Sequence, residues 1–129
     1  MAVTKNEIDA ALEHGHTIDI TTTGRKSGKP RRIEIVFHNI DGRVYVSGIP
    51  RRRRRSWLAN LEANPRFKFH LKRQVQADLD ATARIVTDED ERRQILSQVA
   101  RNWGRDDPEA VETMVRYSPL IEARFEAAA

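Results

Sequence analysis

Regular alternation of apolar and polar residues, broken by turn-forming residues, is the feature that most restricts the fold of this chain. The clearest case is RRIEIVFHNI, which is followed by Asp41-Gly42, a typical hairpin pair, and then by RVYVSG. The same period of two recurs along the sequence, so we expect strands at 16–24, 31–40, 43–48, 67–71, 75–86 and 119–127. Hairpin turns between alternating segments predict an antiparallel sheet or a small barrel and not a parallel α/β fold.

Short helices are expected around these strands. Polar side chains cap the free N–H groups of a first turn, acidic residues favour its dipole, and proline suits its first position. Such residues mark the start of four expected helices. Thr4 precedes a helix over 5–13, and Ser56 precedes one that ends at Asn64-Pro65. Residues 87–90 open a helix that ends at Gly104, and Pro108 opens one that runs to Tyr117. The 129 residues are therefore expected to form one mainly β (α+β) domain of about six mostly antiparallel strands with short flanking helices. Within it, 1–15 is an N-terminal helical segment and 16–129 the barrel with its helices.

The positive charge of the chain is concentrated in one place. The net charge is +4, and the five consecutive arginines Arg51–Arg55 exceed that value, so the rest of the chain is close to neutral. A local anion site is therefore favoured over a general polyanion-binding surface. Aromatic residues make up only 6% of the chain, and without stacking platforms we expect no specific nucleic-acid binding. Peripheral contact of the arginines with an anionic membrane stays open.

Side chains that commonly carry out chemistry are scarce. The chain has no cysteine, and His14, His16, His38 and His70 lack the spacing of a metal motif, so we expect no metal site. His38 and His70 would share a cavity only if their strands paired. No serine has the surroundings of a nucleophile. If the protein is an enzyme, a bound cofactor carries the chemistry. The lack of cysteine and of a signal peptide's apolar core leads us to expect a cytoplasmic protein.

One turn combines glycines with cations. GRKSGKPRR at 24–32 joins two predicted strands and brings Arg25, Lys26, Lys29, Arg31 and Arg32 together with Gly24 and Gly28. Glycines let backbone N–H groups turn inward and the cations neutralise a phosphate, so the turn is suited to an anionic ligand. Taken alone, it is also compatible with an ordinary solvated loop.

Two motifs together resemble a known family. TTTGRKSGKPRR at 21–32 and WLANLEANP at 57–65, in this order and spacing, resemble the deazaflavin (coenzyme F420)-dependent nitroreductase and quinone reductase family. The resemblance extends over about residues 16–103. It implies a split β-barrel like that of FMN-binding proteins. It also implies hydride transfer from reduced F420, a coenzyme with a phosphodiester and an oligoglutamate tail, to a quinone- or nitroaromatic-like acceptor.

The resemblance also implies roles for particular residues. Lys26 and Arg31 would contact the phosphate region, Ser47 and Gly48 would border the deazaflavin, and Trp57 and Asn60 would shape and brace the pocket rim. The full set of expected cofactor contacts is Arg25, Lys26, Ser27, Arg31, Arg32, Ser47, Gly48, Arg54, Arg55, Trp57 and Asn60. Tyr117 is the one candidate proton donor. Related barrels hold FMN, haem or lipid-like molecules, which remain alternatives, and a monomer and a homodimer are both compatible.

Overall fold

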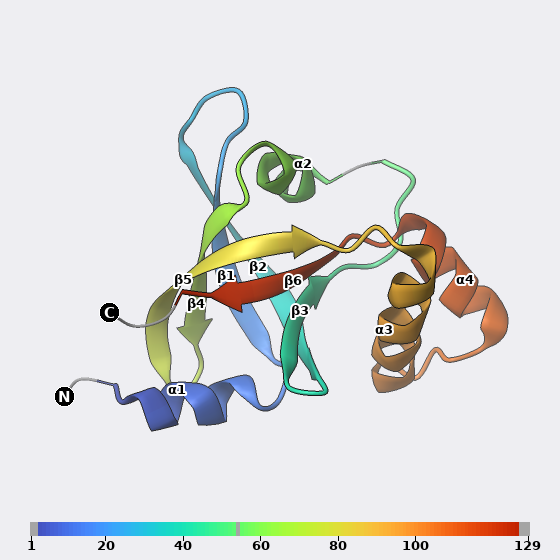
Figure 1. Cartoon of the computed structure of the whole chain (residues 1–129), viewed down its shortest axis with the longest axis horizontal. Helices are drawn as coiled ribbons and strands as arrows, with labels where there is room; N and C mark the ends of the chain where they lie inside the picture. The colour runs from blue at the N-terminus through green and yellow to red at the C-terminus, as the bar shows by residue number, and fades with distance from the viewer. Residues whose placement is uncertain (1–2, 54, 127–129) are drawn as a thin grey trace.

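Six strands form a closed antiparallel barrel in the computed structural model, which describes residues 3–53 and 55–126. The strands are β1 (Thr17–Thr23), β2 (Pro30–Ile40), β3 (Arg43–Ser47), β4 (Arg66–Lys72), β5 (Gln76–Ile85) and β6 (Leu120–Phe125). Their order around the ring is β1-β2-β3-β6-β5-β4, and β4 pairs with β1 to close it (Figure 1). The predicted antiparallel barrel is confirmed, and each predicted strand is present.

The hairpin turn between β2 and β3 has the conformation that its sequence predicts. Asp41 and Gly42 both have positive φ, 54° and 81°, as the two central residues of a tight hairpin turn require. Ile40 pairs with Arg43 directly beside the turn. This register puts alternate residues of both strands on the inner face of the barrel.

Two apolar clusters hold the fold together. The first fills the barrel and contains the inward residues of the strands, among them Ile18, Phe37 and Phe69, all with no exposed area. Phe37 and Phe69 meet edge to face at 5.3 Å. The second cluster lies outside the barrel, where Leu96 and Val99 pack with Tyr45 of β3. The side chains of β3 therefore point alternately into the barrel and toward the second cluster, which explains why four of its five residues are buried.

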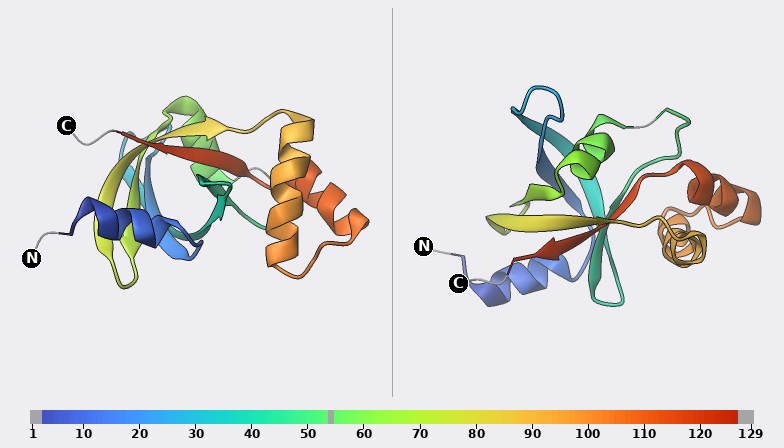
Figure 2. Two further views of the ribbon diagram at one scale, coloured as in Figure 1. Left: turned by 60° about the horizontal axis from the view of Figure 1, so that its bottom comes forward. Right: turned by 45° about the horizontal axis from the view of Figure 1, so that its top comes forward.

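Within the described residues, four helices cover different parts of the barrel (Figures 1 and 2). They are α1 (Lys5–Leu12), α2 (Ser56–Ala63), α3 (Glu89–Asn102) and α4 (Pro108–Tyr117). Helices α3 and α4 pack together at one end, whereas α2 lies beside the long β1–β2 hairpin. Across residues 3–53 and 55–126, no helix combines the length and the apolar character needed to cross a membrane.

The start of α2 differs from the prediction. Ser56 is the first residue of the helix and not its N-cap, which is Arg55, an extended residue that makes no side-chain capping bond. The helix therefore begins one residue earlier than expected, and the Arg55 guanidinium packs against the backbone at Gly48. The expected site residue Arg54 lies outside the described residues.

Candidate functional site

The loop between β1 and β2, residues 24–29, carries the predicted cofactor contacts Arg25, Lys26 and Ser27, and Arg31 and Arg32 follow at the start of β2. The Gly24 N–H donates to the Lys29 carbonyl at 2.8 Å, which closes the loop. Ser27 Oγ accepts a hydrogen bond from the Lys29 N–H at 3.1 Å. Gly28 has φ of 71°, a conformation that side chains disfavour. The sequence GRKSGK thus forms a closed turn, and its cationic side chains point outward from the turn and are exposed.

Asn60 of α2 fixes this loop to the barrel. Its side-chain oxygen accepts from the Arg25 backbone N–H at 3.1 Å and from Arg25 Nη1 at 3.0 Å. Its Nδ2 donates to Thr22 Oγ1 of β1 at 3.1 Å. Asn60 and Thr22 are 4% and 2% exposed, so these bonds lie away from water and an unmade one would be costly. The predicted bracing residue Asn60 therefore joins helix, loop and strand.

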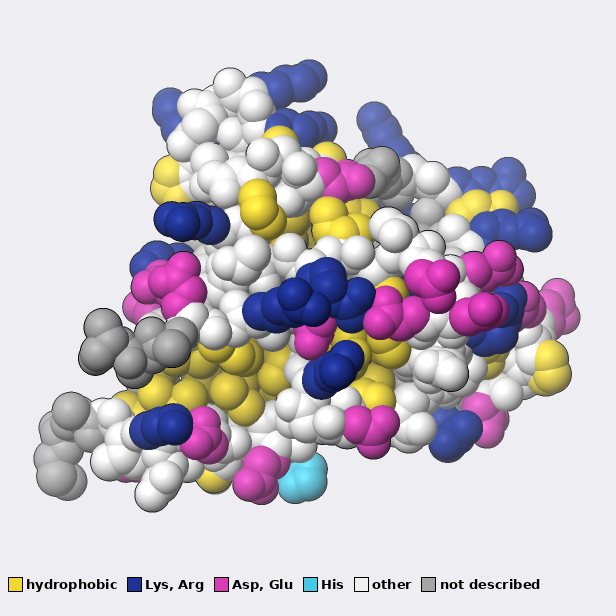
Figure 3. Space-filling model, in the orientation of Figure 1, with side chains coloured by type: hydrophobic (Ala, Val, Ile, Leu, Met, Phe, Trp, Pro, Cys, Tyr) yellow, Lys and Arg dark blue, Asp and Glu magenta, His cyan; other side chains and the backbone are white. Residues whose placement is uncertain are grey.

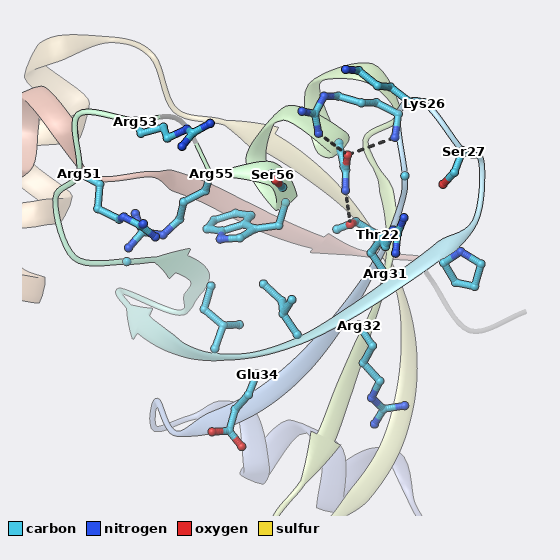
Figure 4. Close-up of a pocket in the computed structure, with 18 residues that line it drawn as sticks. Thr22, Lys26, Ser27, Arg31, Arg32, Glu34, Arg51, Arg53, Arg55 and Ser56 are labelled. Carbon is cyan, nitrogen blue, oxygen red and sulfur yellow. Dashed lines mark hydrogen bonds between the residues drawn. The ribbon is translucent and has the colours of Figure 1, made fainter.

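An open cavity of about 1080 Å³ lies between this loop, α2 and the segment after β3 (Figure 4). Its apolar wall consists of Ile33 and Ile35 of β2 and Trp57 of α2. Of the predicted contacts, it is lined by Arg25, Lys26, Ser27, Arg31, Arg32, Gly48, Arg55, Trp57 and Asn60. The structure therefore brings the two sequence motifs to one concave surface.

The cations at the loop end of the cavity differ in availability. Arg25 is bonded to Asn60, and Arg32 Nε donates to Asp19 Oδ2 at 2.9 Å. Hydrogen bonds from Lys72 and then from Arg32 lower the pKa of Asp19, so this carboxylate stays charged. Among the described residues, the side chains of Lys26 and Arg31 have no hydrogen-bond or ion-pair partner. Of the described cations that line this end of the cavity, Lys26 and Arg31 are therefore the two that are free to neutralise a ligand.

A second cationic group lies at the opposite end of the cavity. Arg51, Arg53 and Arg55 line it, and the guanidinium groups of Arg51 and Arg55 lie close together (Figure 4). A Cβ at Gly48 would be 3.2 Å from three atoms of the Arg55 guanidinium, so glycine permits this close packing. Burial, and then the charge of Arg51, lower the pKa of Arg55. Figure 3 shows Lys and Arg side chains gathered along the upper edge of the molecule.

Two predicted residues lie beside the cavity or away from it. Ser47 does not line it but directly precedes Gly48, is 2% exposed, and its hydroxyl has no partner among the described residues. Tyr117 is half-buried and lines a separate, smaller cavity, where its carbonyl accepts from the Arg51 N–H at 3.4 Å. The structure does not bring Tyr117 to the main cavity.

Sequence reasoning missed several residues of the site. Thr22 is the buried partner of Asn60, and the threonine-rich strand end within the first motif could have indicated it. Ile33 and Ile35 share the predicted inner face with Phe37, but they are only half-buried, because they form the cavity wall. Alternation identifies their face, but it does not distinguish a filled core from a cavity wall.

The histidines do not form a joint site. His38 lies on β2 and His70 on β4. These two strands pair with opposite edges of β1 and not with each other in the described barrel. His70 lies between Thr21 Oγ1, 2.7 Å from Nε2, and Asp78 Oδ1, 2.6 Å from Nδ1. His38 is buried against Trp103, with ring centroids 5.5 Å apart. The described part of the chain contains no cluster of three or more potential metal ligands.

Comparison with known families decides between the possible interpretations of this basic cavity. The sequence model of the F420H(2)-dependent quinone reductase family matches residues 2–115. The chain belongs to this family. It is therefore an oxidoreductase that depends on coenzyme F420. The resemblance inferred from residues 21–32 and 57–65 is confirmed.

Solved structures similar to the reductase share its fold. The conserved hypothetical protein Rv2991 of Mycobacterium tuberculosis is 17% identical with a TM-score of 0.75, over 98% of this chain and 83% of that one. The haem storage protein HutZ of Vibrio cholerae is 20% identical with a TM-score of 0.68, over 96% and 91%. An F420-H2 dependent reductase is 21% identical with a TM-score of 0.55, over 84% and 93%. At these identities the comparisons show the fold, a split β-barrel.

The residues of the main cavity fit the cofactor of the family. Lys26 and Arg31 offer two charges without partners to an anionic group. Ile33 and Trp57 supply an apolar wall for a planar ring. Charge and shape are thus both present for a large anionic cofactor.

Proposed function

We propose that the reductase binds reduced F420 in the main cavity and reduces a quinone-like or nitroaromatic-like acceptor there. When bound, the deazaflavin supplies the hydride. The observation that carries this proposal is the pairing of two unpartnered cations, Lys26 and Arg31, with an apolar wall in one cavity of a chain that belongs to this family.

The protein's own contribution is binding and positioning. Lys26 and Arg31 would hold the anionic part of the coenzyme, while Asn60 keeps their loop in place through Arg25. Ile33 and Trp57 would exclude water from the ring, which strengthens the polar contacts around it. Positioning without a nucleophile is sufficient for hydride transfer from a bound cofactor.

A binding titration tests the cofactor assignment. Lys26→Ala and Arg31→Ala are each expected to weaken the binding of oxidised F420 on the order of tenfold, because each removes a charge-assisted contact. The coenzyme's own absorbance or fluorescence reports binding, so turnover is not needed for the measurement.

The same loop offers a matched control. Lys29 carries the same charge but does not line the cavity, and it joins the loop's hydrogen bonds only through its backbone N–H and carbonyl groups. Lys29→Ala should therefore leave the affinity within about twofold of the wild type. Equal losses in all three variants would show a general charge effect. Tighter binding of FMN than of F420 by the wild type would overturn the proposal in favour of a flavin-binding barrel.

A further inference from the structure

The arginine segment separates the main cavity from a second one. This second cavity, of about 340 Å³, lies between that segment, α2, the end of β5 and the junction of α4 with β6. Its described cationic lining residues are Arg51, Arg52, Arg53, Arg55, Arg92 and Arg116. Arg51, Arg53 and Arg55 also line the main cavity. The wall between the two cavities therefore presents positive charge to both of them.

Most of this charge is not neutralised within the protein. Among residues 3–53 and 55–126, the side chains of Arg51, Arg52 and Arg116 form no ion pair. Arg92 differs, because its guanidinium donates to three backbone carbonyls and is fully used by the fold. Glu62 is the one acidic residue among the described lining residues. The excess of positive charge would be stabilised by an anion placed between the arginines.

A buried hydroxyl points to the same conclusion. Ser118 lines the second cavity and is 4% exposed, yet its Oγ has no hydrogen-bond partner within the described residues. Its backbone groups are both used, since the N–H donates to the Met114 carbonyl and the carbonyl accepts from Arg92. Buried polar groups without a partner are rare in folded proteins. A ligand oxygen would satisfy the Ser118 hydroxyl.

The wall itself is arranged for an anion. The guanidinium groups of Arg51 and Arg55 face each other in Figure 4, although like charges repel. Tyr117 holds the Arg51 backbone through its carbonyl, and Gly48 admits the Arg55 guanidinium. Neither contact neutralises the charge of the two guanidinium groups. The pKa of Arg55, lowered by burial and by Arg51, agrees with an arrangement that lacks its counter-ion.

We propose that the second cavity is an oxyanion site that binds carboxylate or phosphate groups, with Arg52, Arg116 and Ser118 on its far side and Arg51 and Arg55 on the shared wall. Two sources offer this chemistry. One is the acidic chain of a coenzyme bound in the main cavity, and this source rests on the proposed function. The other is a free oxyanion from solution, which does not.

Arg52 and Arg116 allow the second cavity to be altered alone, because they line it and not the main cavity. Both are exposed, so the double variant Arg52→Gln/Arg116→Gln should fold. Arg66→Gln/Arg101→Gln removes the same charge from exposed positions outside both cavities and serves as the control. Each protein is titrated with F420, with the same coenzyme lacking its glutamates, with triglutamate peptide and with inorganic phosphate.

The wild type should bind the glutamate-bearing coenzyme about tenfold more tightly than the form lacking glutamates. Arg52→Gln/Arg116→Gln should remove this difference without weakening the shorter form, and the control should retain it. If the two coenzyme forms bind alike but triglutamate or phosphate binds the wild type and not the double variant, the site holds and its ligand is a free oxyanion.

Two results separate the failure of this inference from that of the proposed function. Equal binding of every probe by the wild type, the double variant and the control would overturn the oxyanion site, while F420 binding by all three would leave the proposed function standing. Absence of binding for both coenzyme forms would overturn the proposed function. In that case calorimetry with phosphate and triglutamate alone decides whether the second cavity is an oxyanion site.

Discussion

Asn60 and Trp57, two residues of the short helix α2, have different roles in the site. They are three positions apart, which puts them on the same face of α2. Both are buried and both line the main cavity, but Trp57 contributes apolar surface whereas Asn60 contributes three hydrogen bonds. An amide is suited to this place because it accepts from Arg25 and donates to Thr22 at the same time.

His38 should make the stability of the protein depend on pH. Burial lowers its pKa from 6.5 to about 4, so the folded protein disfavours the imidazolium. Between these values the unfolded chain binds more protons, and the free energy of unfolding should fall as the pH is lowered, by up to about 3 kcal/mol. Urea unfolding at intervals between pH 7 and pH 4 measures this slope.

The variant His38→Asn removes the titrating group and should flatten the slope in that window, whatever its effect on absolute stability. The lowered carboxyl pKa values of Asp19 and Glu91 affect stability only near and below their ordinary values of 3.8 and 4.5, so the slope between pH 7 and pH 5 is free of their contribution. An unchanged slope in His38→Asn would assign the pH dependence to other groups.

At the scale of elements, Arg92 joins three of them. From α3 its guanidinium donates to the carbonyls of Val115 at 3.0 Å, Val86 at 2.9 Å and Ser118 at 2.6 Å. These carbonyls belong to α4, to the end of the β5 segment and to the connection into β6. The side chain therefore fixes the helical pair to the barrel at the edge of the second cavity.

Arg92→Met keeps the apolar stem but leaves three carbonyls without their donor. We expect a loss of about 2–3 kcal/mol in the free energy of unfolding, measured with urea. Arg93→Met is the neighbouring control, because Arg93 makes exposed ion pairs with Glu89 and Glu112. The control should unfold like the wild type within experimental error. Similar stability of the two variants would show that the three carbonyls are satisfied by water.

The elements themselves could largely be predicted from the sequence, and their arrangement only in part. Alternation marks a strand wherever one face meets a core and the other is more exposed, as in β1 and β5. It carries no information on which distant strands pair, so the neighbours of β6 could not be derived. The start of α2 was missed by one residue, because Ser56 lies inside the helix and Arg55 is its N-cap without a side-chain capping bond, an exception to the usual capping preference.

The site was predicted through its charges and motifs more than through its shape. GRKSGKPRR indicated an anion-binding turn because glycines and cations have a direct physical meaning there. Which of those cations are free depends on Asp19 and Asn60, residues from other elements that only the folded chain brings close. Nothing in the arginine run showed that it separates two cavities.

At the scale of the whole molecule, β6 is the strand that makes the sheet a ring. It pairs with β3, where Val46 meets Ile121, and with β5, where Ala83 meets Ala123. The hairpins β1–β2–β3 and β4–β5 are local in sequence, whereas both pairings of β6 reach back over long stretches of chain. Local pairings form readily, and pairings over large sequence separations are slower.

This order has a consequence for synthesis of the chain. Until residues 120–125 are available, β3 and β5 present two unpaired edges, which are templates for pairing between molecules. A chain shortened to residues 1–118 should therefore form thioflavin-positive aggregates, whereas one shortened to 1–126 should stay free of them in size-exclusion chromatography. A monomeric, folded 1–118 chain would contradict this expectation. During synthesis, the growing chain thus has unpaired sheet edges until residues 120–125 leave the ribosome. We expect chaperones to act during this interval.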